Sequence, residues 1–434
     1  MDIVFLNRNR DLHDFDEEAR ESNLVVLMGR RRVGKTELIR EWARRGGVMA
    51  YSQAIESASV SQQIQQLWAD FKGSVALDIE PKNWEELLQL MTLPKDRHVF
   101  VLDEFPYLVA SDRSLPSRIQ KWLDHHCPPH ITLCLAGSSQ TMMQQLFYDG
   151  NAALYGRARR ILNIRPLAYR YFCEAVKVAP KDPLSFLLYS MVGGIPKYWR
   201  AFQPNWKPLD AAYQLFFGEN AFFDNEMLRL TSDEHITGAS SMAALEAIGR
   251  GAHKPIEIAG RLGIKQTSLN KVLSALVTSH IVRRDIPFGE SERTSKRGLY
   301  RVVDPFVLFH YGVYSPHKSR WSIYEAATQQ KLLNDHASIV FEESYRSLFP
   351  SASRYYEGGD IEIDSVRFSS ETTITVSEVK FRPVSASEKS SLLEKLKRNF
   401  ERSQLSRFAA KYNIDYEVVD WRQGISDIIR QQPD

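Results

Sequence analysis

The segment 29–36, Gly-Arg-Arg-Arg-Val-Gly-Lys-Thr, constrains the fold of this chain more than any other feature. It has the required residue at every fixed position of the pattern G-x-x-x-x-G-K-[S/T]. An apolar run at 24–28 predicts a buried strand before it, and 36–43 predicts a helix after it. In that setting, backbone N–H groups and the start of the helix form a cradle for phosphate groups. The segment therefore predicts an α/β fold with a P-loop NTPase core.

The pattern also assigns roles to individual side chains. Lys35 is expected to contact the β- and γ-phosphates, and the Thr36 hydroxyl to ligate Mg²⁺. We therefore expect ATP and Mg²⁺ as the cofactors. The residues of this segment expected to bind the nucleotide are Gly29, Arg30, Arg31, Arg32, Val33, Gly34, Lys35, Thr36 and Glu37.

A second motif supports this core. Residues 98–104 form an apolar run that ends in two carboxylates, Asp103 and Glu104. Asp103, at the tip of the predicted strand, is expected to hold Mg²⁺, and Glu104 to polarise the attacking water. Neighbouring residues on a strand point to opposite faces, so two adjacent acids can serve different purposes. Together the two motifs predict ATP hydrolysis.

Two further polar positions are candidates for contact with the γ-phosphate. A third apolar run at 131–136 precedes Ser138 and Ser139, where a serine could contact the phosphate, cap the next helix, or do both. Arg157 lies in a basic segment farther along and is a candidate for stabilising charge in the transition state. The alternative for Arg157 is an exposed basic turn. The sequence leaves open whether it acts within one chain or across an interface.

Length and composition limit the class of protein. A chain of 434 residues predicts several domains, and its net charge of +3 neither requires nor excludes nucleic acid. Cys127, Cys134 and Cys173 lack C-x-x-C spacing, which disfavours a zinc site or a disulfide framework. No apolar run approaches the ~20 residues of a membrane span, and the N-terminus lacks the order of a signal peptide. We expect a cytoplasmic protein with no membrane partner.

The middle of the chain has the pattern of a winged helix-turn-helix. Helices predicted at 256–263 and 266–276 are joined by a tight turn that contains glycine. The second of them has apolar residues at the spacing of one buried face. Runs at 281–285 and 299–303 predict a β-hairpin that follows these helices.

Such a module either binds DNA or serves as a packing unit, and the sequence leaves both open. In the first case the start of the second helix would face the major groove and the hairpin loop would contact phosphates. The groove-facing candidates are Gln266, Thr267, Ser268 and Lys271, and the basic loop residues are Arg293, Lys296 and Arg297. An aromatic segment from Asp304 is expected to pack between domains.

The C-terminal third predicts the order helix, strand, strand, strand, helix, strand. The ranges identified are a helix at 337–348, strands at 360–366 and 373–381, a basic helix at 388–411 and a strand at 416–420. The basic helix either follows a DNA backbone or is an ordinary exposed face. Its cations are Lys395, Lys397, Arg398, Arg402 and Arg407.

This order resembles the PD-(D/E)XK nuclease core. Asp364 matches the first acid of that motif, while Glu378 and Lys380 match the (D/E)-x-K element and share one face of a strand. Glu342, from the preceding helix, would complete a site of hard oxygen ligands for Mg²⁺ with Asp364 and Glu378. Glu362 could assist. The resemblance implies catalytic roles for Asp364, Glu378 and Lys380, and whether the domain cleaves DNA is left open.

The order of motifs along the whole chain resembles that of the archaeal-type ATPases, an AAA/STAND-related family of P-loop proteins. The shared segments are 5–8, the P-loop, 103–104, 137–139, 155–157, 166–167 and 193–196. The resemblance implies that Asn7 and Arg8 lead into the nucleotide site. It also implies that Pro196, in a helical lid, approaches the base.

The sequence thus predicts four units. They are a P-loop ATPase core at 1–170, a helical lid at 171–235, a winged helix at 236–315 and a restriction-endonuclease-like α/β domain at 316–434. We expect an ATPase that acts on DNA, with ATP or ADP and DNA as partners and a homo-oligomer left open. The alternative is a STAND-like nucleotide-gated switch with a non-catalytic C-terminal module. A third hypothesis is a toxin or defence effector.

Overall fold

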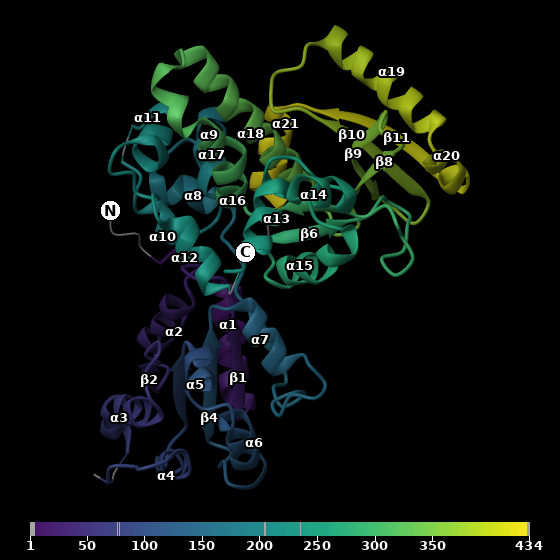
Figure 1. The fold of residues 1–434 in the computed structure, drawn as a ribbon. Helices are drawn as coiled ribbons and strands as arrows, with labels where there is room; N and C mark the ends of the chain where they lie inside the picture. Colours follow the sequence, from purple (N-terminus) through teal and green to yellow (C-terminus); the bar gives the residue numbers. More distant parts are fainter. Residues whose placement is uncertain (1–4, 76, 78, 204, 235, 432–434) are drawn as a thin grey trace.

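The computed structural model describes residues 5–75, 77, 79–203, 205–234 and 236–431. The N-terminal sheet and its helices lie at one end of the molecule, and the remaining chain is gathered at the other end (Figure 1). Within the described residues, no helix combines the length and the apolar character that a membrane crossing requires.

The N-terminal unit is a five-stranded parallel sheet with the order β2-β3-β4-β1-β5. Every residue of β1, β3 and β4 is buried, which explains their apolar sequences. The sheet thus places β4 between the P-loop strand β1 and the acidic strand β3. The strands are β1 (Leu24–Met28), β2 (Met49–Gln53), β3 (His98–Asp103), β4 (Ile131–Gly137) and β5 (Ile161–Asn163).

Helices cover both faces of this sheet, and each face has its own hydrophobic core. These helices are α1 (Asn9–Glu21), α2 (Lys35–Arg44), α3 (Val60–Phe71), the short η1 (Lys72–Ser74), α4 (Trp84–Leu90), α5 (Phe105–Ser111), α6 (Leu115–His125) and α7 (Gln140–Phe147).

A helical segment follows the sheet. Its elements are α8 (Tyr169–Val176), α9 (Pro183–Val192), α10 (Pro196–Trp199), α11 (Pro208–Ala212), the π-helix η2 (Tyr213–Phe217) and α12 (Glu226–Asp233). Helix α9 is almost entirely buried, because it lies between α8 on one side and α16 and α18 on the other. Phe186 of α9 contacts Phe341 and Phe381 of the C-terminal region at ring distances of 5.4 and 5.3 Å. One continuous core therefore joins this segment to the C-terminal region.

Three helices and a hairpin form the middle unit. They are α13 (Ala239–Gly249), α14 (Pro255–Leu262), α15 (Gln266–Thr278), β6 (Val282–Asp285) and β7 (Leu299–Val302), the strands being antiparallel. Leu269, Leu273 and Leu276 of α15 are buried, as its apolar spacing predicted. The chain continues through α16 (Pro305–Phe309), η3 (His310–Tyr314), α17 (Ser315–His317) and η4 (Lys318–Ile323).

The C-terminal unit has the predicted order of elements. Its sheet is β11-β10-β9-β8, with β10 and β11 parallel and the other pairs antiparallel. The elements are α18 (Ala326–Arg346), β8 (Ser353–Glu357), β9 (Ile361–Phe368), β10 (Thr373–Val379), α19 (Ala386–Arg402), α20 (Gln404–Phe408), η5 (Ala409–Lys411), β11 (Asn413–Val419) and α21 (Trp421–Gln431).

Two helix boundaries in this unit differ from the prediction. Helix α18 begins 11 residues earlier than the predicted 337. The basic helix ends at Arg402, because Ser403 is extended and its hydroxyl donates to the Phe400 carbonyl at 2.6 Å. That bond satisfies a carbonyl at the helix end, and the chain then forms the separate helix α20.

Candidate functional site

The P-loop joins β1 to α2, and both of its glycines are required. Gly34 has φ 108°, a left-handed conformation that favours glycine. A Cβ atom at Gly29 would lie 2.7 Å from the Ile164 carbonyl oxygen. Buried Arg8 stabilises the loop, because its Nη2 donates to the Val33 carbonyl at 2.6 Å. The turn therefore keeps its shape through backbone geometry and one buried arginine.

Lys35 is buried within this turn. Its Nζ donates to the Gly29 carbonyl at 2.7 Å and to the Ser138 hydroxyl at 3.1 Å. Burial lowers the pKa of Lys35, while the carboxylates of Glu104 and Asp103 act in the opposite direction. The ammonium group therefore lies between the P-loop and the end of β4, where phosphate oxygens are expected.

Thr36 and Asp103 form a second contact between the two motifs. The Thr36 hydroxyl donates to Asp103 Oδ2 at 2.8 Å. Tyr51 of β2 donates to the same oxygen at 2.7 Å, and burial raises the pKa of this phenol well above its ordinary value. The hydroxyl and carboxylate oxygens suit Mg²⁺, which Thr36 and Asp103 would hold next to the phosphates. Tyr51 was missed because no strand was predicted at 49–53.

Glu104 faces Ser138. The residue is in a left-handed conformation with φ 54°, and its two carboxylate oxygens accept from the Ser138 hydroxyl and from the Ser138 N–H, the latter at 3.2 Å. Ser138 therefore touches both Lys35 and Glu104. Ser139 instead caps α7, because its hydroxyl accepts from the Met142 N–H at 3.3 Å. The adjacent parallel strands β3 and β4 bring these side chains together.

These residues open into a cavity of about 510 Å³. Pro196 lines it, and its contact with the base stays a prediction. Phe5, Leu6 and Leu167, from segments shared with the archaeal-type ATPases, line it as well, together with Lys197 and Arg200, which were not predicted. Only a glycine fits at position 194, since a Cβ there would collide with the Leu167 carbonyl oxygen. The cavity thus combines a phosphate cradle with an apolar wall suited to a base.

The three arginines of the P-loop are paired with carboxylates of later elements. Arg31 pairs with Asp233 and Arg32 with Glu226, both on α12. Arg30 pairs with Asp304, which directly precedes α16. Arg31 and Arg32 also line the nucleotide cavity, whereas Arg30 lines a different one. The loop expected only to bind nucleotide therefore also links the ATPase sheet to two downstream segments.

Other predicted residues lie at the edge of the site or outside it. Asn7 contacts the Tyr171 hydroxyl and is not among the described residues that line the cavity. Glu37 lines the cavity and pairs with Arg40 at 3.3 Å. Arg157 pairs with Asp124 of α6 at 2.8 Å and does not line the cavity within one chain. Its role across an interface remains a prediction.

Asp364, Glu378 and Lys380 meet on β9 and at the end of β10, as the motif predicts. Lys380 Nζ lies 3.3 Å from Asp364 Oδ2 and 2.8 Å from Glu378 Oε1. The Val379 N–H donates to the same Asp364 oxygen at 2.8 Å. Burial lowers the pKa of Lys380, but the two carboxylates outweigh it and raise that pKa. Burial and Asp364 raise the pKa of Glu378.

The acids predicted to hold Mg²⁺ pair with basic side chains in this structure. Glu342 accepts from Arg354 at 2.9 Å, and Arg354 also pairs with Glu362 at 3.0 Å. Burial and the charge of Asp364 raise the pKa of Glu342 to about 7. In the part of the chain that the structure describes, no three His, Cys, Asp or Glu side chains are grouped to hold a metal ion. Arg354 and Lys380 thus place positive charge beside these acids, and the Mg²⁺ site on Glu342, Asp364 and Glu378 stays a prediction.

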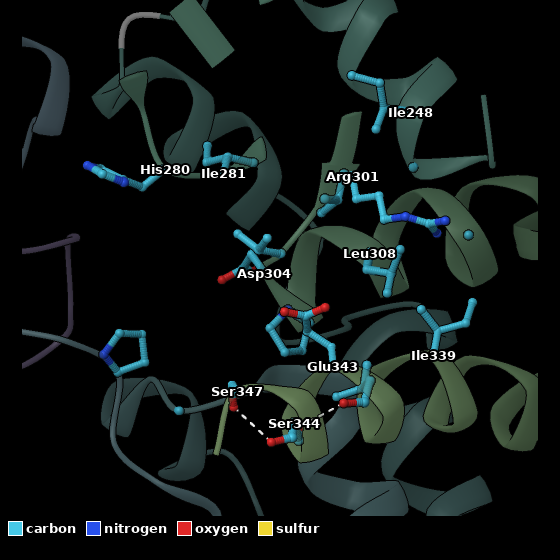
Figure 2. A pocket seen from close by; sticks show the side chains of 18 of the residues that line it. Ile248, His280, Ile281, Arg301, Asp304, Leu308, Ile339, Glu343, Ser344 and Ser347 are labelled. Carbon is cyan, nitrogen blue, oxygen red and sulfur yellow. Dashed lines mark hydrogen bonds between the residues drawn. The ribbon is translucent and has the colours of Figure 1, made fainter. Parts of the chain in front are cut away.

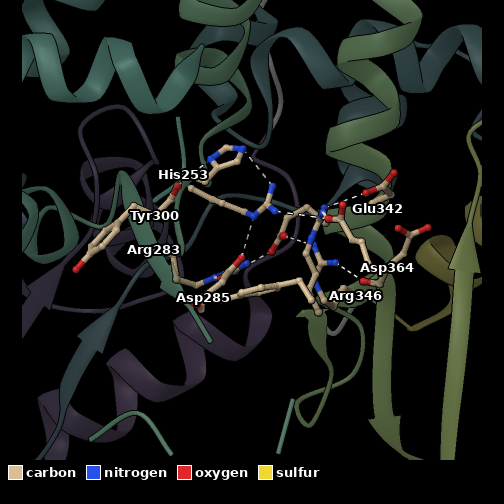
Figure 3. A network of polar contacts seen from close by, with 12 residues as sticks. His253, Arg283, Asp285, Tyr300, Glu342, Arg346 and Asp364 are labelled. Atoms are coloured by element: carbon tan, nitrogen blue, oxygen red, sulfur yellow. Dashed lines mark hydrogen bonds and ion pairs between the residues drawn. The ribbon is translucent and has the colours of Figure 1, made fainter. Parts of the chain in front are cut away.

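A network of polar contacts connects these acids to the β6–β7 hairpin (Figure 3). Arg283 pairs with Glu343 of α18 at 2.7 Å, and Arg301 lies 3.7 Å from Glu362. Arg346 donates to the Asp364 carbonyl. The hairpin loop packs on the same unit, because Phe288 is buried in the core of the C-terminal sheet. The hairpin therefore acts as a packing element here.

The basic and polar surface candidates are accessible. The predicted groove-facing residues of α15, namely Gln266, Thr267, Ser268 and Lys271, are all exposed. The five predicted cations of α19 and α20 are exposed as well. In the hairpin loop, Arg293 and Lys296 are exposed, whereas Arg297 pairs with Glu290.

A second cavity, of about 800 Å³, lies between the ATPase sheet, the middle unit and α18. Figure 2 shows Asp304 and Glu343 facing it, with Ile281, Leu308 and Ile339 along its walls. Arg30 of the P-loop lines it too. The space is therefore bounded at one end by the P-loop and at the other by the helix that carries Glu342.

Glu234, at the end of α12, predicts a pH-dependent stability. Only 4% exposed, it accepts from the Gln140 N–H at 3.1 Å, and burial raises its pKa from 4.5 to about 7. A raised carboxyl pKa means that the folded state binds the proton more tightly, so stability decreases as pH rises from 4.5 to 7. We expect Glu234→Gln to remove this decrease, which is worth about 3 kcal/mol at most.

Thermal unfolding at pH 5 and pH 8 measures the effect. The melting temperature of Glu234→Gln should exceed that of the parent chain at pH 8 and match it at pH 5. Glu219→Gln, at an exposed position, serves as the control and should follow the parent chain. An equal pH dependence of the melting temperature in all three proteins would show that ionisation of Glu234 does not destabilise the folded state.

Two sequence comparisons show what this chain is similar to. Residues 5–202 match the model of a family described as an ATPase domain predominantly from Archaea. An uncharacterised protein of Methanocaldococcus jannaschii is 28% identical over 349 residues, which cover 78% of this chain and 76% of the relative.

Solved structures give a further comparison. A Walker-type ATPase of Pyrococcus abyssi superimposes with a TM-score of 0.50 and 17% identity, over 70% of this chain and 95% of that one. The ORC2 protein of Aeropyrum pernix, solved with ADPNP and ADP, gives a TM-score of 0.44 and 11% identity, over 77% and 96%. The chain has an α/β fold with a parallel sheet, like that of P-loop NTPases.

Proposed function

We propose that this protein hydrolyses ATP at the P-loop and uses it to act on DNA. The contacts of Ser138 with Lys35 and with Glu104 support the proposed ATP hydrolysis. Glu104 takes a proton from a water that attacks the γ-phosphorus, the bond to the bridging oxygen breaks, and ADP and phosphate result. Thr36 and Asp103 would hold Mg²⁺, which would supply positive charge next to the phosphates. A γ-phosphate that engages Ser138 would release Glu104 for this task.

The proposed action on DNA rests on exposed surfaces of the middle and C-terminal units. We propose that residues 236–315 form a winged helix whose exposed α15 face reads the duplex, while the cations of α19 and α20 contact phosphates. The Arg30–Asp304 pair supports coupling, because it joins the P-loop to the segment that directly follows β7. The protein would act in the cytoplasm.

DNA binding tests this part. Fluorescence anisotropy with a labelled duplex should show weaker binding by Lys397→Glu/Arg398→Glu, and its slope of log K against log salt should be smaller by about 0.9 per lost phosphate contact. Lys82→Glu/Lys95→Glu makes the same charge change at exposed positions near α4 and should bind like the parent chain. Equal loss in both double variants would indicate a general charge effect, and no loss would remove α19 from the interface.

We propose further that the C-terminal unit is nuclease-like, with Asp364, Glu378 and Lys380 as its central residues. The support is their convergence on neighbouring strands in the predicted helix and strand order. Nicking of supercoiled DNA in Mg²⁺ or Mn²⁺ should be lost in Asp364→Ala and in Lys380→Ala. Cleavage that persists in both variants would come from another source.

The Glu342–Arg354 pair favours a second candidate, a STAND-like nucleotide-gated switch with a non-catalytic C-terminal module. A carboxylate already held by a buried arginine is not an open metal ligand. In that case ATP turnover would be slow, ADP would remain bound after purification, and the oligomeric state would change with the nucleotide. Size-exclusion chromatography with ADP and with a slowly hydrolysed ATP analogue distinguishes the two candidates.

A further inference from the structure

ATP hydrolysis develops negative charge on the transferred phosphoryl group, and a nearby arginine can stabilise that charge. Arg157 was the sequence candidate, but its guanidinium pairs with Asp124 on α6, away from the cavity. Other arginines line the cavity: Arg31 and Arg32 of the P-loop, and Arg8, Arg44 and Arg200. The question is which of them lies nearest the reacting group.

Arg31 lines the same cavity as Lys35, Thr36, Glu104 and Ser138, the residues expected to surround the γ-phosphate. Its charge lowers the pKa of Lys35. Burial lowers the pKa of Arg31 itself, but the carboxylates of Asp233 and Glu104 outweigh that effect. Arg31 is therefore close enough to both catalytic side chains for its charge to act on them.

Arg31 is also the P-loop arginine with most freedom to change partner. Its side chain is 48% exposed, whereas that of Arg32 is 20% exposed. The partner of Arg32, Glu226, is buried and also accepts from the Tyr198 hydroxyl at 2.8 Å. Arg30 pairs with Asp304 and lines the other cavity. Neither neighbour is placed to reach the reacting phosphate as easily.

We propose that Arg31, an arginine of the P-loop, is a catalytic residue for ATP bound to the same chain. In the transition state Arg31 breaks its ion pair with Asp233 and contacts the γ-phosphoryl oxygens. This rests on the ATP hydrolysis proposed above. The exchange leaves the Asp233 carboxylate without its cation. Since the other Asp233 oxygen is already buried without a hydrogen-bond partner, α12 should shift when Arg31 leaves. Each turnover would therefore change the position of α12.

Single-turnover hydrolysis of the full chain tests the proposal with four variants. An arginine of this kind is worth about 10³-fold or more, so Arg31→Ala should lose about that factor while its ATP affinity stays within about threefold. Arg31→Lys should recover part of the rate. Arg113→Ala, at an exposed position, should hydrolyse ATP like the parent chain. Asp233→Asn removes the same ion pair but keeps Arg31, so it should remain active.

Trapping with ADP and aluminium fluoride, which imitates the transferring phosphoryl group, gives a second measurement. The parent chain and Asp233→Asn should retain ADP with aluminium fluoride, and Arg31→Ala should not, although it binds ADP alone. Equal losses in Arg31→Ala and Asp233→Asn would make Arg31 a structural anchor of α12 and overturn the proposal. So would hydrolysis by Arg31→Ala within tenfold of the parent rate, or a parallel loss of ATP affinity. An inactive parent chain would instead overturn the proposed hydrolysis itself.

Discussion

Replacing Lys35 with alanine should weaken ATP binding by about 100-fold, equivalent to about 2.8 kcal/mol. The ammonium group is buried, and it donates to the Gly29 carbonyl and the Ser138 hydroxyl at the place where phosphate oxygens are expected. Without it, the phosphates lose a charge-assisted hydrogen bond in a site with little water, which is where such bonds are strongest.

Isothermal titration with ATP and Mg²⁺ measures this loss. A ligand that binds only the folded state also raises its melting temperature, so ATP should stabilise the parent chain but not Lys35→Ala. Lys35→Met keeps most of the side-chain volume and removes the charge. It should fold like the parent chain and bind ATP as weakly as the alanine variant. Tight ATP binding by Lys35→Met would mean that the charge of Lys35 does not hold the phosphates.

Replacing Glu104 with glutamine should leave ATP binding intact and slow hydrolysis by about 10²- to 10⁴-fold, the usual contribution of a general base. Glutamine keeps the shape of the side chain and one oxygen that can accept from Ser138. It cannot take a proton from water. The variant should therefore accumulate as an ATP-bound protein.

Single-turnover hydrolysis and the ratio of bound ATP to bound ADP measure the effect. Glu56→Gln, at an exposed position, makes the same chemical change and should hydrolyse ATP at the parent rate. If Glu104→Gln turned over normally, the base would have to be another residue. The contact of Ser138 with Glu104 would then be structural.

The nucleotide site was predictable because its residues follow strands that lie side by side. Lys35, Asp103, Glu104 and Ser138 lie at the carboxyl ends of β1, β3 and β4, or just after them, and a parallel sheet brings those ends to one edge. Local motifs therefore predicted that residues far apart in the sequence belong to one site, and two of them, Lys35 and Ser138, are in contact.

Residues that act through tertiary pairing were not predictable. Arg354 carries no motif, and it is found beside Glu342 only because β8 packs against α18. Tyr51 lies on a short strand that alternates between buried and half-buried residues and contains no run of apolar residues. Likewise, the partners of Arg31 and Arg32 lie about 200 residues away, on α12. No spacing rule relates such residues.

These ion pairs give the P-loop arginines a structural role in addition to the predicted binding of nucleotide. The sequence assigned all three to the nucleotide, whereas the structure connects each to a carboxylate outside the ATPase sheet. We expect any nucleotide contact that draws one of these arginines away to disturb α12 or the start of α16. The second cavity is lined by Arg30 of the P-loop and by Glu343 of α18. It therefore extends from the P-loop toward the C-terminal acids.

We propose that ATP use at the P-loop is coupled to DNA at the other end of the chain. The ATPase rate of the full chain, measured as duplex DNA is added, reports this coupling. We predict that DNA changes the rate at least severalfold, that Glu104→Gln stays inactive throughout, and that Lys397→Glu/Arg398→Glu needs more DNA for the same change. A rate that is the same with and without linear, circular and single-stranded DNA would show that ATP use is not coupled to DNA.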